Sequence, residues 1–358
     1  MRKILMLTIL LMLPWLVNAP AFAQAPAQDK APALNQQDIQ RKIDELQKQV
    51  DALKEQGRTR EKLSITAEEK AEQEKAVLTA VGREYTLMQK GTFELEYSLR
   101  YEYAASTELT RLIGNTVIFD PQTKSNHTIR NAIGVQYGLL NNLTVNVNVP
   151  FVYVYDKTGT TAARDATDLG DVTVGLDYQP FKASDWPTTT LTMSAILPTG
   201  RSPFKIDRET DLPTGSGFYG VSLGMNMSKS LDPAMAFGAL SATYRFKPHG
   251  VEQKQLDGRI LDQIEPGMSF NAALGMAYAI SYAVSMNVQF QYGYYMNTKY
   301  YFLNSATPSE SATYSTASLI LGTGWRITPK TTLALSLGIG LTSNDPDFLF
   351  MLRLPFMF

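Results

Sequence analysis

The sequence predicts an all-β transmembrane barrel of about twelve antiparallel strands, preceded by a short coiled coil and a linker or plug α-helix. Three observations predict this fold class. A signal-like N-terminus is followed by no apolar stretch long enough for a membrane helix, alternating apolar and polar residues fill positions 92–358, and the chain ends on Phe358. An exported chain without membrane helices can cross a membrane only as a closed barrel, because each backbone polar group needs a partner inside the structure.

Residues 1–23 are predicted to be a cleaved signal peptide. Arg2 and Lys3 precede an apolar run over 4–17, and the small-x-small pattern at 21–23 suits cleavage after Ala23. The apolar run is too short for a good membrane span. We therefore expect the mature chain to be exported.

Residues 24–56 are predicted to form a periplasmic leader and a short coiled coil. Apolar residues recur at intervals of four, three, four and three, which is a heptad pattern. They are Ile39, Ile43, Leu46, Val50 and Leu53, the predicted oligomerisation seam. The alternative is an amphipathic helix on the periplasmic mouth of the barrel, although such a helix normally has a wider apolar stripe. A coiled coil this short is weak alone, so other contacts are expected to support the oligomer.

Residues 57–91 are predicted to be a linker that contains a second helix over 66–81. Thr66 and Glu69 form a capping box at its start, and Val77, Leu78 and Val81 make its last turns apolar. Two interpretations fit this pattern equally well. One is a solvated linker helix, and the other is a plug in a polar lumen.

Twelve alternating segments predict the strands of a barrel domain over 92–358. Most are about ten to fourteen residues long, which suits tilted membrane strands better than the five or six residues typical of soluble proteins. The connections alternate between long and short, except for a short one at 343–346, as expected for outer loops and periplasmic turns. The predicted strands are 92–103, 126–138, 143–155, 168–179, 188–198, 217–228, 235–246, 267–279, 283–296, 313–325, 331–342 and 347–358.

The phase of the alternation predicts which side chains face lipid. In FELEYSLRYEY, residues 93–103, the odd positions are apolar or aromatic and the even positions are polar or charged. An arginine that faces lipid at mid-bilayer costs about 2 to 4 kcal/mol, so the even positions are expected to face the lumen. The predicted lumen-lining charges are Glu94, Glu96, Arg100, Glu102, Asp171, Asp177, Arg245 and Arg353.

The last strand, DFLFMLRLPFMF, resembles the C-terminal signature of bacterial outer-membrane barrels. That resemblance implies that Phe350, Phe356 and Phe358 form an assembly signal and that the barrel assembly machinery is a partner. The alternative is a terminal core strand of a β-sandwich.

Composition and residue types argue against an enzyme. The formal net charge of -1 gives no reason to expect nucleic acid, and the absence of cysteine excludes disulfides and thiol chemistry. His127 and His249 are the only histidines, and no motif supports a serine hydrolase. Asp165, Asp168 and Asp171 lack the spacing of an EF-hand, so loop solvation is preferred over Ca²⁺ binding. No cofactor and no metal are predicted.

Two motifs resemble a known family of outer-membrane barrels named for the meta pathway of phenol degradation. They are DLGDVTVGLDY at 168–178 and LPTG, which occurs at 197–200 and again at 212–215.

The whole arrangement resembles the secretion channel of the functional-amyloid (Fap) system. That resemblance implies a homotrimer joined by the coiled coil, a plug formed by 66–81, and export of unfolded amyloid subunits for biofilm fibres across the Gram-negative outer membrane. From spacing alone, β-branched residues at a with leucine at d are better known from dimers.

The leading hypothesis is therefore an outer-membrane channel that exports unfolded amyloid subunits and is gated by the plug. The alternative is a diffusion channel for small aromatic or hydrophobic solutes, and a third possibility is a structural anchor. A twelve-stranded barrel leaves a lumen on the order of 12 Å across, so protein cargo would have to pass unfolded.

Overall fold

The computed structural model describes residues 45–48 and 87–358, except 114–115, 160–161, 181–185, 208–209, 232–233, 249–250, 252, 256–257, 282, 304, 306 and 329–330. The chain divides into two units, Met1–Ser64 and Ile65–Phe358. In the first unit, residues 45–48 are helical and the Leu46 side chain is 59% exposed. The signal peptide, the rest of the heptad residues (Ile39, Ile43, Val50 and Leu53) and the helix predicted over 66–81 lie outside the described residues.

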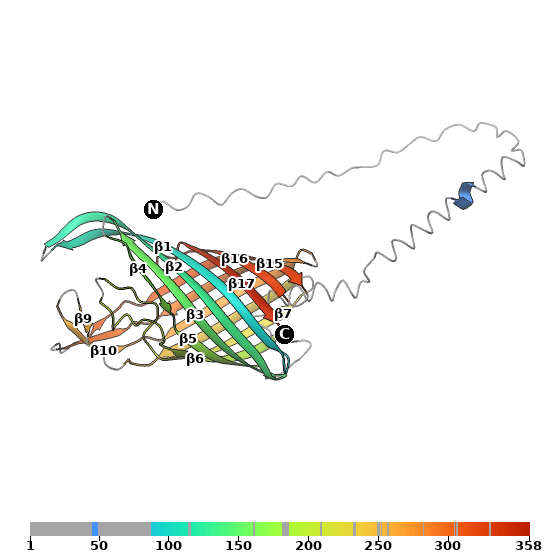
Figure 1. Ribbon diagram of the computed structural model, residues 1–358, viewed down its shortest axis with the longest axis horizontal. Helices are drawn as coiled ribbons and strands as arrows, with labels where there is room; N and C mark the ends of the chain where they lie inside the picture. Colours follow the sequence, from blue (N-terminus) through green and yellow to red (C-terminus); the bar gives the residue numbers. More distant parts are fainter. Residues whose placement is uncertain are drawn as a thin grey trace, which may run out of the picture. The chain divides into compact units, whose positions relative to one another are not determined.

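The second unit contains a closed antiparallel β-barrel with twelve strand positions, which confirms the predicted barrel. β4 and β5 share one position, because both pair with β3. β1 pairs with β17, and the β2–β3 pairing completes the ring (Figure 1). The wall consists of β1 (Phe93–Ile113), β2 (Thr116–Leu140), β3 (Leu143–Thr158), β4 (Arg164–Leu169), β5 (Val172–Tyr178), β6 (Thr188–Leu197), β7 (Gly220–Ser230), β8 (Ala234–Arg245), β11 (Ser269–Ala279), β12 (Val284–Tyr295), β15 (Tyr314–Thr328), β16 (Thr331–Gly340) and β17 (Phe348–Met357).

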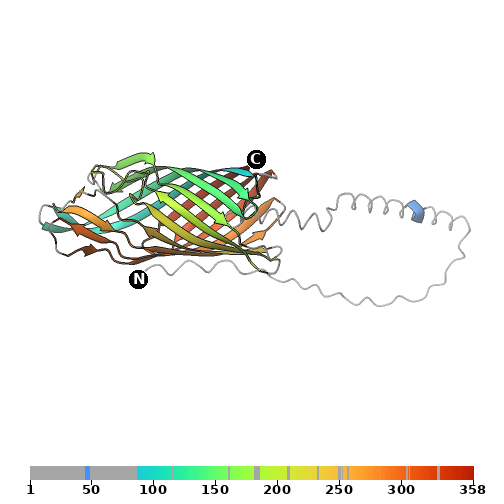
Figure 2. The same cartoon turned by 90° about the horizontal axis from the view of Figure 1, so that it is seen from below.

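The two ends of the barrel differ in their connections. Short turns and Phe358 lie at one end, here called the turn end. Long connections lie at the other, the loop end, together with a small second sheet of β9 (Gln253–Lys254), β10 (Ile260–Glu265), β13 (Lys299–Phe302) and β14 (Ser309–Glu310). Figures 1 and 2 show the C-terminus at the end opposite the long loops.

All twelve predicted strands are present, but the loop end holds more regular structure than the alternation predicts. β1 and β2 continue as a paired hairpin to Ile113 and Thr116, where a loop over 104–125 was expected. Threonine and serine in this stretch pair well across strands, and the first strong turn signal is the Gly-Asn dipeptide at 114–115. The small sheet was also expected to be loop, because its strands are too short to show a clear period.

Large apolar side chains cover the outside of the wall. Leu274, Trp325 and Leu223 are 70%, 60% and 58% exposed, and they share the outward phase of their strands. An apolar surface this extensive is rare on a soluble protein and is typical of a wall that contacts lipid. Among the residues that the structure describes, no helix is both long and apolar enough to span a membrane.

Aromatic side chains gather at both rims of this apolar surface, as in the girdles of membrane barrels. At the turn end they are Phe93, Tyr137, Tyr178, Tyr278, Trp325 and Phe358, and at the loop end Tyr244, Phe246, Tyr294 and Phe348. Also at the loop end, Tyr101 hydrogen-bonds His127 Nδ1 at 2.9 Å, and the rings of Tyr103 and Tyr155 lie beside His127.

The strand registers fix the width of the barrel. Following paired residues once around the ring displaces the path along β1 by about 14 residues. For twelve strands this stagger corresponds to a tilt of about 40° and a backbone radius of about 12 Å. The lumen is therefore wide enough for a small molecule.

Candidate functional site in the barrel lumen

Charged side chains line one side of the lumen, formed by β17 and β1 to β5. The registers place each of them in the inward phase of its strand, next to inward neighbours on the adjacent strands. We call seven of them the charged arc: Glu94, Glu96, Arg100, Glu102, Arg130, Asp177 and Arg353. Asp156, Arg164 and Asp168 occupy further inward positions nearer the loop end.

The rest of the wall, formed by β6 to β8, β11, β12, β15 and β16, is the neutral arc. Its inward positions carry Ser, Thr, Asn, Gln, Gly, Ala and a few larger apolar residues. In the described strands of this arc, the only charged residues at inward positions lie near strand ends: Arg245 at the loop end and Arg326 at the turn end. The lumen therefore has a charged side and an uncharged side.

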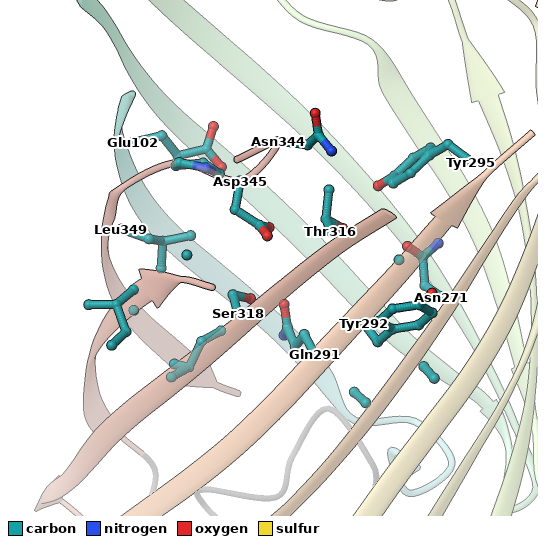
Figure 3. Close-up of a pocket in the computed structure, with 18 of the residues that line it drawn as sticks. Glu102, Asn271, Gln291, Tyr292, Tyr295, Thr316, Ser318, Asn344, Asp345 and Leu349 are labelled. Carbon is teal, nitrogen blue, oxygen red and sulfur yellow. The ribbon is translucent and has the colours of Figure 1, made fainter. Parts of the chain in front are cut away.

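A cavity of about 530 Å³ lies between the two arcs toward the loop end, and Figure 3 shows its lining. From the charged arc it receives Arg100 and Glu102, whose side chains form an ion pair with Nε to Oε1 at 2.6 Å. From the neutral arc it receives Asn271, Gln291, Thr316 and Ser318, among others. Asp345 of the β16–β17 connection also lines the cavity, and its Oδ2 accepts from Ala317 N at 2.6 Å and from Thr342 Oγ1 at 2.7 Å. The cavity thus offers an ion pair on the charged arc, hydroxyl and amide groups on the neutral arc, and this one carboxylate.

Gly293 leaves room for neighbouring side chains at one point of the neutral arc. A Cβ at Gly293 would lie 2.6 Å from Thr316 Oγ1 and 3.2 Å from Asn271 Oδ1. The missing side chain therefore leaves space over β12 for both polar groups. Two residues farther toward the loop end, the rings of Tyr295 and Tyr314 stack with their centroids 4.6 Å apart.

A second cavity, of about 280 Å³, lies at the turn end of the charged arc. Glu94, Glu96 and Arg353 line it, and Glu94 is only 3% exposed. On the neutral arc at this end, Met235, Phe237, Ala277 and Ala279 form an apolar cluster. Phe237 lies against Gly275, where a Cβ would come within 2.5 Å of its ring.

Two other predicted lumen residues serve mainly to hold their neighbours. Asp177 accepts a hydrogen bond from Asn146 Nδ2 at 2.6 Å. Arg245 donates to Ser269 Oγ at 3.2 Å. Neither belongs to the lining of the two lumen cavities described here.

Asp171 holds a loop in place. Its Oδ1 accepts from Gly200 N at 3.2 Å and its Oδ2 from Ser216 N at 2.6 Å. These two donors come from the two LPTG motifs or the residue directly after them. The hydroxyls of Thr199 and Thr214 complete the contact by donating to Gly170 O and Leu169 O, each at 2.7 Å.

The break between β4 and β5 makes this arrangement possible. Gly170 N donates to Pro150 O at 2.8 Å, and a Cβ on Gly170 would lie 2.8 Å from Val152 Cγ2 and 3.0 Å from Pro150 Cγ. Pro150 has no N–H to donate, so it is tolerated where the ladder is interrupted. One extra residue in β4–β5 relative to β3 forms a bulge, which directs Asp171 to the loop.

The β6–β7 connection lies in the mouth of the barrel at the loop end. Leu212 packs on Val152, Val154 and Ala166, which are inward residues of β3 and β4. Phe204 and Phe218 of the same connection pack on a buried apolar cluster. This cluster consists of Leu261 and Ile264 of β10 and Val251, which precedes β9. This mouth loop, residues 198–219, narrows the entrance.

An ion pair joins the second sheet to the end of β8. Lys247 Nζ hydrogen-bonds Glu265 Oε1, which raises the pKa of Lys247 and lowers the pKa of Glu265. Both groups are solvent-exposed, so the pair adds little to stability.

Several features of the site escaped the sequence prediction. Arg130 was not among the predicted charges, although its even number puts it in phase with the small and polar residues of its strand. The contact between the two LPTG motifs and Asp171 depends on residues far apart in the sequence, so no local pattern could reveal it. Within the described residues, no cluster of acidic or histidine side chains could hold a metal ion, and Asp165, Asp168 and Asp171 do not converge.

The predicted assembly residues lie along β17. Phe356 is 38% exposed and Phe358 is 70% exposed on the outer surface. Phe358 N donates to Phe93 O at 2.9 Å, and the two rings lie 5.9 Å apart. The predicted plug residues Thr66, Glu69, Val77, Leu78 and Val81 lie outside the described residues.

Comparison with known proteins identifies the type of barrel. A family model described as "Putative MetA-pathway of phenol degradation" matches residues 111–356, which is more than half of the chain. Among solved structures, an outer membrane channel from Pseudomonas putida F1 aligns with a TM-score of 0.58 and 17% identity over 76% of this chain and 98% of that chain. This similarity supports the fold.

Two further solved structures align less well. The translocator domain of the autotransporter NalP from Neisseria meningitidis has a TM-score of 0.46 and 12% identity over 78% of this chain and 93% of that chain. The toluene transporter TodX from Pseudomonas putida has a TM-score of 0.36 and 9% identity over 79% of this chain and 92% of that chain. Scores at this level carry no argument about this chain.

Proposed function

This chain belongs to the family described by the MetA pathway of phenol degradation, and from that premise we propose that it is an outer-membrane channel for small aromatic solutes. The solutes diffuse through the lumen without chemical change. The proposal places the turn end in the periplasm of a Gram-negative cell and the loop end outside, the usual arrangement of short turns and long loops.

The observation that carries the proposal is the two-sided lumen. The cavity near the loop end has Arg100 and Glu102 on one side and uncharged side chains of β8, β11, β12, β15 and β16 on the other, and Asp345 of the β16–β17 connection also lines it. An aromatic solute with one polar group can use both sides, because the uncharged lining also includes the apolar Ala239, Ala273 and Ile320. Its ring can follow the neutral arc while its polar group exchanges partners along the charged arc, so no step leaves that group without a hydrogen-bond partner.

The first test compares an aromatic and a non-aromatic organic anion. Purified full-length protein is placed in planar bilayers, and reversal potentials are measured in gradients of potassium benzoate and potassium gluconate against potassium chloride. We expect the benzoate-to-gluconate permeability ratio to exceed the ratio of their mobilities in water by at least about threefold, because only benzoate has an apolar face. Equal ratios, or a barrel that conducts nothing, would contradict the proposal and favour the structural anchor.

Export of unfolded amyloid subunits through a trimeric, plugged channel remains a second proposal with weaker support. It depends on the coiled coil and the helix over 66–81, and family membership favours solute diffusion instead. A deletion strain separates the two: export predicts the loss of surface fibres, whereas diffusion predicts slower growth on a dilute aromatic carbon source. Folding of the barrel by the assembly machinery is expected in either case.

A further inference from the structure

A pocket of about 460 Å³ lies in the mouth of the barrel, separate from the two lumen cavities. Three elements build it: the mouth loop, the second sheet and the start of β4. Its apolar lining includes Phe204, Leu212, Leu261, Tyr300 and Phe302. Tyr300 and Phe302 are two residues apart on β13 and so share one face of that strand.

Buried contacts hold the walls of this pocket. Gln253, only 7% exposed, donates from Nε2 to Pro203 O at 2.8 Å and to Ile206 O at 3.0 Å, which ties the mouth loop to β9. Leu261 is 3% exposed, and the rings of Phe204 and Phe218 lie 5.1 Å apart. The guanidinium of Arg259 lies 4.0 Å from the centroid of the Phe302 ring and covers one of its faces.

The polar lining restricts the kind of ligand. Arg164 and Asp211 contribute one formal charge of each sign, and Gln255 contributes an amide. Together they can donate to and accept from a neutral hydroxyl group. The two formal charges of the lining balance, so a neutral hydroxyl group needs no further counter-charge there.

The volume is in the usual range for small-ligand sites, which is about 300 to 1,000 Å³. Aromatic walls favour an aromatic ring, because ring pairs add attraction beyond the apolar area that they bury. We propose that this pocket binds a neutral hydroxylated monoaromatic compound of the phenol type and concentrates it at the entrance of the lumen. This rests on the proposed function only in treating the bound compound as the transported solute.

Binding is measured with 4-fluorophenol and full-length protein in detergent, by fluorine NMR at neutral pH, where phenols are uncharged. We expect Ile206→Trp, which adds an indole to the pocket lining, to weaken binding at least about tenfold. Lys205→Trp is the matched control, because Lys205 is exposed and does not line the pocket. Equal effects of the two variants, or wild-type protein that binds no 4-fluorophenol, would overturn the proposal.

A second variant tests the aromatic preference and replaces Ile206→Trp if that protein loses the heat-modifiable gel mobility of a folded barrel. Phe302→Leu removes a ring but keeps an apolar side chain. It should weaken binding of 4-fluorophenol while leaving competition by cyclohexanol unchanged. If wild-type protein binds cyclohexanol as tightly as 4-fluorophenol, the pocket is not selective for aromatic compounds and the proposal is wrong.

The outcomes for pocket and channel are separable. If wild-type protein prefers benzoate over gluconate but does not bind 4-fluorophenol, the channel proposal stands and the pocket proposal fails. If it binds 4-fluorophenol but shows no benzoate preference, the pocket proposal stands and the channel proposal fails.

Discussion

Asp171 shows how much one carboxylate can organise at the mouth of a barrel. It accepts from both ends of the segment that contains the two LPTG motifs, and so it closes the mouth loop onto the joint between β4 and β5. Asp171 is also one of the predicted lumen-lining charges. Its contacts give it a role in positioning the loop that carries Phe204 and Leu212.

Asp171→Ala should therefore release the mouth loop while the barrel stays folded. Hydrogen bonds to a charged acceptor contribute about 1.5 to 3 kcal/mol each, so local opening should become at least tenfold more frequent. Limited trypsin digestion, which can cleave after Arg201 and Lys205, measures this opening. Asp165→Ala is the control, since Asp165 pairs with outward-facing Tyr155. Unchanged cleavage in Asp171→Ala would show that the loop is held by its apolar contacts alone.

At the scale of the strands, the most informative contact is the seam between β1 and β17. The register runs from Glu94 opposite Met357 to Tyr103 opposite Phe348, and it brings the first and last strands of the wall together. Phe358 extends this seam by one hydrogen bond and one ring contact with Phe93. If the strands join the wall in chain order, the pairing of β1 with β17 forms last. The contacts of Phe358 with Phe93 at the end of this seam should therefore affect closure of the barrel.

Phe358→Ala should weaken closure without changing the rest of the wall. Loss of the ring pair removes about 0.5 to 1.5 kcal/mol beyond the lost apolar area. We expect a lower transition temperature in heat-modifiability gels and slower folding into detergent micelles. Phe270→Ala removes a lipid-facing ring far from the seam and is the matched control. If both variants melt alike, the effect comes from lost lipid contact.

Apart from β4 and β5, the wall strands carry a period of two for ten or more residues, and lipid on one side makes that pattern strong, so they were predictable. The short strands of the second sheet were not, because two to six residues in a loop show no period. The pocket in the mouth was unpredictable for a related reason. Its lining comes from separate parts of the chain, such as Phe204, Gln253 and Tyr300. These side chains line one pocket only after the second sheet and the mouth loop have packed together.

Across the whole molecule, charged side chains of both signs gather on one side of the lumen. Glu94, Glu96, Glu102 and Asp177 face the lumen from the same side as Arg100, Arg130 and Arg353. The sequence predicted most of these charges through the phase of each strand. It could not predict that they would fall on one side, which depends on which strands become neighbours in the closed ring.

The double variant Glu94→Gln, Glu96→Gln should shift ion selectivity toward chloride. It removes two negative charges from the cavity that also contains Arg353. The potassium-to-chloride permeability ratio, taken from reversal potentials, should fall at least about twofold at low salt. It should fall less at 1 M, where screening limits the influence of a charge to about 3 Å. Asp262→Asn removes an exposed charge on β10 and should leave the ratio unchanged. A ratio that stays at the wild-type value in the double variant would mean that ions pass outside the influence of this arc.

The joint at Gly170 and Asp171 also limits how the chain can change in length. Inward residues are even-numbered in β4 and odd-numbered in β5, and both sets meet the even-numbered inward residues of β3. Gain or loss of a single residue here would turn one half of the strand over and expose either Asp168 or Asp177 to lipid. Only changes by two residues preserve both faces, so this short stretch tolerates insertions in even steps, whereas a surface loop accepts any number.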